Sequence, residues 1–136
     1  MYMKKKAKCA ILTIAIMGSA ALTVSAYHFR GYFSRNVGYG NRPAVSDYVY
    51  KMQSSRNWVL NVTSNKSSKS MRYELVNSNG ENRGTGKTSS GTFRPTELSC
   101  SGQQGNKYKL KVTKMADHNP MKAYSVIANW DTDANK

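Results

Sequence analysis

The strongest constraint on the fold is an alternation of apolar and polar residues that begins near Asp47 and recurs toward the end of the chain. The segment Lys107–Val112, for example, reads Lys-Tyr-Lys-Leu-Lys-Val. In a β-strand a period of two places one set of side chains on a core and the other in water. The predicted core consists of Trp58, Leu60, Val62, Tyr73, Leu75, Leu110, Val112, Tyr124, Val126 and Trp130. In the segment 48–53 the same reasoning places Tyr48, Tyr50 and Met52 together on the apolar side.

Clusters of turn residues separate these alternating segments. Asn79-Gly80 is the clearest of them, because both residues tolerate the positive φ of a tight hairpin turn. No segment after residue 46 keeps a helical period of 3.6. Pro95 interrupts the weaker segment Phe93–Cys100, which predicts an edge strand or an irregular one. The sequence therefore predicts an all-β fold, a small antiparallel β-sandwich or barrel.

The first 26 residues have the organisation of a secretory signal peptide. Four lysines within residues 4–8 precede an uncharged, mostly apolar run, Cys9–Val24. Val24-Ser25-Ala26 then offers small residues to a signal peptidase, so cleavage is expected after Ala26 and the protein is expected to be secreted. The alternative is an uncleaved membrane anchor, but the run is shorter than the roughly 20 apolar residues that span a bilayer.

Residues 27–46 differ from the chain on either side. Arg30, Arg35 and Arg42 lie among aromatic and glycine residues, and no period is sustained. This composition predicts a flexible cationic and aromatic arm in front of a β-sandwich-like domain over residues 47–136.

Net charge indicates the class of partner. The chain carries a net charge of +14, and removal of residues 1–26 leaves 17 Lys and Arg against 7 Asp and Glu, a net charge of +10. Such a charge favours an anionic wall polymer or membrane surface. Nucleic acid is disfavoured, because Tyr108 lies on the strand face opposite the neighbouring lysines and offers no base stacking there. The sequence leaves the oligomeric state open.

Cys100 is the single cysteine that remains after removal of residues 1–26, so no intramolecular disulfide is expected. A small exported domain without disulfides must be held together by packing. This cysteine usage is more typical of export from a Gram-positive bacterium than of an animal secretory pathway.

The most specific candidate for a binding site is the alternating lysines of residues 107–111. On one strand their side chains point to one face at intervals of about 7 Å, which suits a polyanion. The full predicted polyanion-binding set is Lys107, Lys109, Lys111, Lys114, Arg30, Arg35 and Arg42. An equally good interpretation is that lysines on an edge strand prevent edge-to-edge aggregation.

Three short motifs suggest catalysis or metal binding at first sight. The segment Glu81–Thr88 ends like a phosphate-binding loop, but glutamate stands at its first glycine position and its flanks favour strands. The segment Asp131–Lys136 begins like a calcium loop, but the sequence ends before the required glutamate, so we expect a frayed, solvated terminus. Cys100 and His118 are the candidates for a thiol–imidazole pair, and Cys100 is better explained as a buried core residue. We expect no enzymatic activity, no cofactor and no metal.

Residues 56–133 resemble small exported β-proteins of Gram-positive bacteria, some of them bacteriocin-like. The resemblance lies in the segment Asn57–Val62, in Gly84-Thr85-Gly86, and in the closing Tyr124-Ser125-Val126 and Asn129-Trp130-Asp131. It implies an exported β-protein and assigns no functional residue.

Together these features predict a secreted, non-catalytic protein that binds an anionic cell-envelope surface. One alternative is a bacteriocin-like antagonist of related bacteria, suggested by the arginine and aromatic content of residues 27–46. Another is an immunity or protein–protein interaction module, which would expose a contiguous apolar patch.

Overall fold

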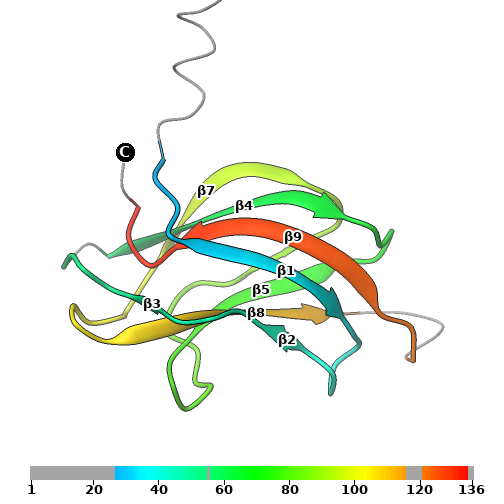
Figure 1. The fold of residues 1–136 in the computed structure, drawn as a ribbon, viewed down its shortest axis with the longest axis horizontal. Helices are drawn as coiled ribbons and strands as arrows, with labels where there is room; N and C mark the ends of the chain where they lie inside the picture. The colour runs from blue at the N-terminus through cyan, green and yellow to red at the C-terminus, as the bar shows by residue number, and fades with distance from the viewer. Residues whose placement is uncertain (1–26, 55, 116–120, 135–136) are drawn as a thin grey trace, which may run out of the picture.

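The computed structural model describes residues 27–54, 56–115 and 121–134, which form nine strands and no helix (Figure 1). The predicted signal peptide, residues 1–26, and His118 lie outside the described residues. The strands are β1 (Gly31–Val37), β2 (Ala44–Val45), β3 (Val49–Tyr50), β4 (Asn57–Asn65), β5 (Met71–Val76), β6 (Lys87–Ser89), β7 (Phe93–Ser99), β8 (Lys107–Lys114) and β9 (Tyr124–Asp131). The prediction of an all-β fold is confirmed.

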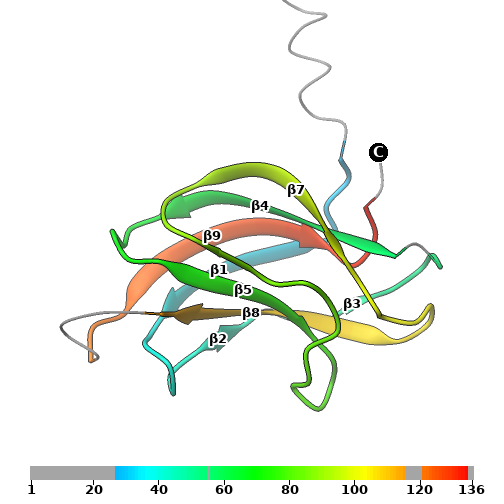
Figure 2. The same cartoon turned by 180° about the vertical axis from the view of Figure 1, so that it is seen from behind.

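The strands form two antiparallel sheets that face each other as the layers of an open sandwich (Figures 1 and 2). The first sheet has the order β1-β9-β4-β7. The second has the order β2-β8-β5-β6, and β3 also pairs with β8. Strand β7, which contains Pro95, lies at an edge of the first sheet, as predicted.

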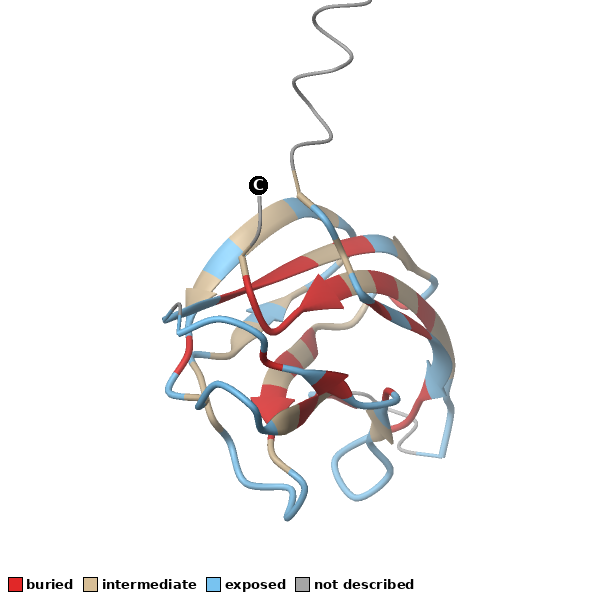
Figure 3. Cartoon of the chain, turned by 60° about the vertical axis from the view of Figure 1, so that its left-hand side comes forward, coloured by how far each residue is buried: buried red, intermediate tan, exposed pale blue. Residues whose placement is uncertain are grey.

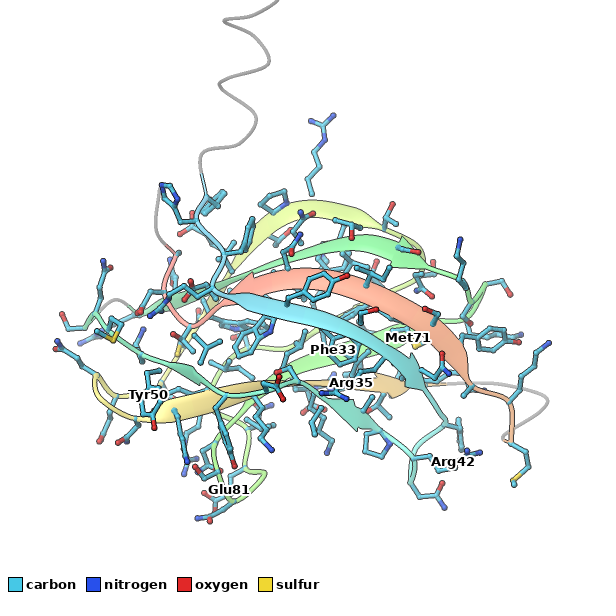
Figure 4. The ribbon with its side chains drawn as sticks, in the orientation of Figure 1. Phe33, Arg35, Arg42, Tyr50, Met71 and Glu81 are labelled. Carbon is cyan, nitrogen blue, oxygen red and sulfur yellow. The ribbon has the colours of Figure 1, made fainter. Side chains whose placement is uncertain are left out.

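The core lies between the two sheets and follows the predicted alternation. Nine of the ten predicted core residues are buried, and Tyr124 packs against them with partial exposure, so the phase of these strands was predicted correctly. Figure 3 shows the alternation as bands of buried and less buried residues along the ribbons. Further buried residues include Phe33, Met71 and Ala128, and Figure 4 shows Phe33 and Met71 between the layers.

Residues 27–46, predicted to be a flexible arm, include two strands of the sandwich, β1 and β2. Residues 31–37 form β1, which pairs along its whole length with β9, and Phe33 and Val37 are buried in the core. Before β1, the Tyr27 hydroxyl donates to Glu97 Oε2 at 2.8 Å, 70 residues away in the sequence. The domain therefore begins before residue 47, and every strand and every core residue that the structure describes lies within residues 27–134.

Close packing between β1 and β9 explains why the sequence of β1 lacks a clear period. A Cβ atom on Gly31 would lie 2.4 Å from Nε1 of Trp130, whose side chain is fully buried. The backbone of β1 approaches the indole so closely that only glycine fits at this position.

A buried ionic cluster joins the two ends of the domain. The Lys51 ammonium donates to Asp133 Oδ1 at 2.8 Å and to the Thr132 carbonyl oxygen at 2.9 Å, and both charged side chains are fully buried. Arg30 donates to Asp133 Oδ2 at 2.8 Å and to both carboxylate oxygens of Asp131. The prediction that residues 131–136 fray into solvent is therefore wrong for residues 131–133, which have 0% exposure.

Because of the same cluster, the side chains of residues 48–52 face the opposite way from the prediction. Val49 and Lys51 are buried, whereas Tyr48, Tyr50 and Met52 are exposed. Lysine is normally an exposed residue, and it is buried here because a carboxylate and a carbonyl far away in the sequence bind its charge.

Candidate functional site

Lys107, Lys109 and Lys111, here called the lysine row, lie on the outer face of the second sheet. Their neighbours on β8, Tyr108, Leu110 and Val112, are buried on the inner face, so the predicted separation of the two faces is confirmed. The lysines themselves are of intermediate exposure, which is expected when aliphatic stems lie along a sheet and the ammonium groups reach water.

The interpretation that these lysines protect a free edge is wrong. One side of β8 pairs with β5 over residues 109–114. The other side pairs with β3 at Lys107 and Tyr108 and with β2 at Lys111 and Val112. Because β8 has partners on both sides, aggregation through its edge is already prevented and the lysine row requires another explanation.

Tyr48 organises the first half of the lysine row. The Nζ atoms of Lys107 and Lys109 lie 4.3 Å and 4.2 Å from the centroid of its ring. Both distances are within the range of cation–π attraction, which is worth about 0.5–1 kcal/mol at an exposed site. One aromatic ring thus contacts two ammonium groups of the row.

The lysine row forms no ion pair with a carboxylate in the part of the chain that the structure describes. Among the described residues, none of the three lysines has an ion pair within 4.0 Å. Lys111 lies opposite Glu74 in the β5–β8 register, but Glu74 pairs with Arg72 at 3.5 Å. The lysine row is therefore a concentrated positive surface.

Lys114 does not belong to the lysine row, contrary to the prediction. Its side chain has 0% exposure, donates to the Lys122 carbonyl oxygen, and lies 5.2 Å from the centroid of Tyr124. The alternation explains its position: Lys114 shares the inward parity of Leu110 and Val112, so it points between the sheets at the end of β8.

Arg30 is likewise excluded from a polyanion site, because two aspartates already bind it. It contacts Asp131 at 2.5 Å and Asp133 at 2.8 Å. The hydrogen bonds that Arg30 donates to the Asp131 carboxylate are the main reason why the pKa of Arg30 is raised. Burial alone would raise the pKa of Asp133, but the hydrogen bonds from Lys51 and the Met52 backbone N–H, with the charges of Lys51 and Arg30, hold it below its ordinary value.

Arg35 and Arg42 are on the surface, and each has a partner outside the lysine row. Arg35 lies 3.6 Å from Asp47, and Arg42 donates to the Met121 carbonyl oxygen at 2.9 Å. Figure 4 shows Arg42 and Tyr50 at opposite ends of the molecule, and Tyr50 is opposite Lys107 in the β3–β8 register. Of the seven predicted residues, the structure brings together Lys107, Lys109 and Lys111.

Sequence reasoning missed the aromatic part of this site. Tyr48 and Tyr50 were placed on the apolar side of their segment, yet they are 38% and 55% exposed and flank the lysines. In residues 48–53 both alternating sets contain apolar side chains, so the sequence alone does not show which set faces the core. The structure buries the other phase because Asp133 binds Lys51, and that contact joins residues 82 positions apart.

The remaining motifs do not assemble a second site. The Cys100 thiol is buried, and its sulfur accepts from the Gly102 N–H at 3.2 Å. The segment Glu81–Thr88 has isolated bridges at Asn82 and Gly84 and then enters β6, without the helix that a phosphate-binding loop needs. Within the described ranges, no group of three His, Cys, Asp or Glu side chains could hold a metal ion, and no helix could cross a membrane.

Comparison of the chain with protein-family models, with curated proteins and with solved structures found no match.

Proposed function

We propose that the chain is a secreted, non-catalytic protein that binds an anionic surface of the cell envelope through the lysine row. The observation that carries this proposal is that three lysines project from an interior strand whose edges are both paired. Two of them share one tyrosine ring, and no carboxylate within 4.0 Å neutralises them among the described residues.

Electrostatics supports binding at this face. Successive lysines of the row are about 7 Å apart, so their charges repel one another in the free protein. A row of phosphates or carboxylates would convert this repulsion into attraction. Because the lysines are in contact with solvent, the affinity should fall as the ionic strength rises.

A co-sedimentation assay tests this function. The chain from Tyr27 to Lys136 is mixed with isolated Gram-positive cell walls or with anionic vesicles, at low and at physiological salt. We expect binding that survives physiological salt in the parent chain but only low salt in the variant Lys107→Gln/Lys109→Gln/Lys111→Gln. The matched control, Arg56→Gln/Lys66→Gln/Arg94→Gln, removes three exposed positive charges elsewhere and should bind like the parent chain. Equal loss in both variants would mean that net charge, not this face, governs binding.

Secretion is part of the proposal and has its own test. Expression of the full chain in a Gram-positive host should release a protein whose first residue is Tyr27, as measured by intact mass. A full-length chain retained in the membrane fraction would instead support the uncleaved anchor.

A bacteriocin-like antagonist is the alternative function. It was suggested by the arginine and aromatic content of residues 27–46, of which residues 31–37 form a strand of the first sheet and Arg30 is bound by aspartates. It remains testable by adding the purified chain to cultures of related strains. Growth inhibition would support it and count against a purely adhesive role.

A further inference from the structure

A polar cleft opens at the end of the second sheet, directly beside the lysine row. Its volume is about 500 Å³, and its lining includes Tyr50, Asn79, Arg83, Gln103, Asn106 and Lys107. We call it the amide cleft. Lys107 belongs both to the amide cleft and to the lysine row, so the two form one continuous surface.

The loop between β5 and β6 builds one wall of the amide cleft and is held in a fixed shape. The Asn77 side-chain oxygen accepts from the backbone N–H groups of Asn79 and Glu81, at 3.0 Å and 2.9 Å. Gly80 has a positive φ of 81°, which the tight turn at Asn79-Gly80 requires. Figure 4 shows this loop, with Glu81, extending away from the second sheet.

Three side-chain amides of the lining are available to a ligand. Asn79, Gln103 and Asn106 are exposed, and within the described ranges their side chains form no hydrogen bond to the protein. Each amide offers donors and an acceptor at once, which is the hydrogen-bonding pattern that hydroxyl groups match. Arg83 is held by Glu81 at 2.6 Å, so Lys107 is the cation of the lining that no carboxylate binds.

Tyr50 adds an aromatic wall. Its side chain is 55% exposed and lies opposite Lys107 in the β3–β8 register. An exposed tyrosine ring provides a rigid apolar face with a polar edge, at a small cost in conformational entropy. The C–H face of a sugar ring stacks on such a surface while its hydroxyl groups remain free to bond amides.

We infer that the amide cleft and the lysine row together bind an anionic polysaccharide, with one sugar unit against Tyr50 and its acidic groups on Lys107 and Lys109. This inference rests on the proposed function and names the class of its ligand. The row from Lys107 to Lys111 extends over about 14 Å, so the ligand is a chain rather than a single sugar. A lipid bilayer is a poorer match, because its charged surface presents few hydroxyl groups to a cleft lined with amides.

The test compares polyanions that differ in whether they contain sugar. The chain from Tyr27 to Lys136 is titrated by calorimetry with polygalacturonate, with polyphosphate of similar charge, and with vesicles containing anionic phospholipid. The variant Tyr50→Ala removes the aromatic wall, and Tyr50→Phe retains it. Tyr32→Ala is the matched control, because Tyr32 is 63% exposed on β1 in the other sheet.

We expect Tyr50→Ala to weaken polygalacturonate binding at least fivefold and to change polyphosphate binding by less than twofold. Tyr50→Phe and Tyr32→Ala should bind polygalacturonate like the parent chain. Equal effects of Tyr50→Ala on polygalacturonate and polyphosphate would overturn the inference while leaving the proposed function intact. A loss confined to vesicles would overturn it in favour of a membrane ligand. Failure of the parent chain to bind any polyanion would refute the proposed function itself.

Discussion

The substitution Lys51→Met tests whether the buried ionic cluster that joins the two ends of the domain stabilises the fold. Methionine has nearly the length of lysine, so the change removes the ammonium group with little loss of packing. It leaves Asp133 Oδ1 and the Thr132 carbonyl oxygen without the donor that contacts them at 2.8 Å and 2.9 Å. All of these groups are shielded from water, so solvent cannot readily replace the lost hydrogen bonds.

The expected destabilisation is large. Removing one partner of a buried ion pair costs about 3–5 kcal/mol. We expect the lower end of this range, because Arg30 and the Met52 N–H still hold Asp133 Oδ2. A loss of about 3 kcal/mol is a substantial part of the roughly 5–15 kcal/mol that stabilises a small domain. It corresponds to a fall in melting temperature on the order of 10 °C.

Urea denaturation followed by fluorescence of the two tryptophans, both of them buried, measures this loss. The matched control is Lys66→Met, which removes an exposed lysine and should change the free energy of unfolding by no more than about 0.5 kcal/mol. If Lys51→Met unfolded at the same urea concentration as Lys66→Met, the contact between Lys51 and Asp133 would not stabilise the fold, contrary to our expectation.

Three further predictions concern the same fold. The pKa of Asp133 is below its ordinary value in the folded chain, so its stabilising contribution is complete above pH of about 4 and is lost as the pH falls through the folded pKa. In urea titrations Asp133→Asn should therefore lose less stability between pH 4 and pH 2 than the parent chain. An equal loss of stability in both chains over this pH range would contradict this. Gly31→Ala should lower the free energy of unfolding by about 1–3 kcal/mol, because its methyl group would overlap the indole of Trp130; a denaturation midpoint equal to that of the parent would show that β1 can move away. The thiol of Cys100 should react with iodoacetamide only after denaturation, as mass spectrometry would show, and rapid labelling of the folded chain would mean that the thiol is accessible.

The fold class and most of the core could be predicted because alternation is a local signal. Segments such as Lys107–Val112 carry their inner and outer faces within a few residues, and each face was placed correctly. β1 could not be recognised in this way. Gly31 is required by the indole of Trp130, and Arg35 breaks the alternation because it is exposed at a position that shares the inward parity of Phe33 and Val37.

The lysines of the candidate site could be predicted from local alternation, but its tyrosines could not, because their exposure depends on contacts far away in the sequence. The lysine row lies within residues 107–111 and can be recognised from the sequence. Whether it protects a free edge depends on whether β8 is an edge strand, and that is decided by its pairing with β2, β3 and β5. The burial of Lys51, and with it the exposure of Tyr48 and Tyr50, depends on a carboxylate 82 residues away. Such long-range pairings have no local signature in the chain.

If the proposed function is right, a defined face of the protein, and not its overall positive charge, governs binding to the envelope. The most direct test measures the affinity of the parent chain for isolated cell walls at several salt concentrations and plots the logarithm of affinity against the logarithm of salt concentration. We expect a markedly shallower slope for Lys107→Gln/Lys109→Gln/Lys111→Gln, because fewer counterions are released when those charges are gone. The charge-matched control, Arg56→Gln/Lys66→Gln/Arg94→Gln, should keep the slope of the parent chain. Identical slopes for the two variants would contradict the account, because the lysine row would then contribute no more than any other positive charge.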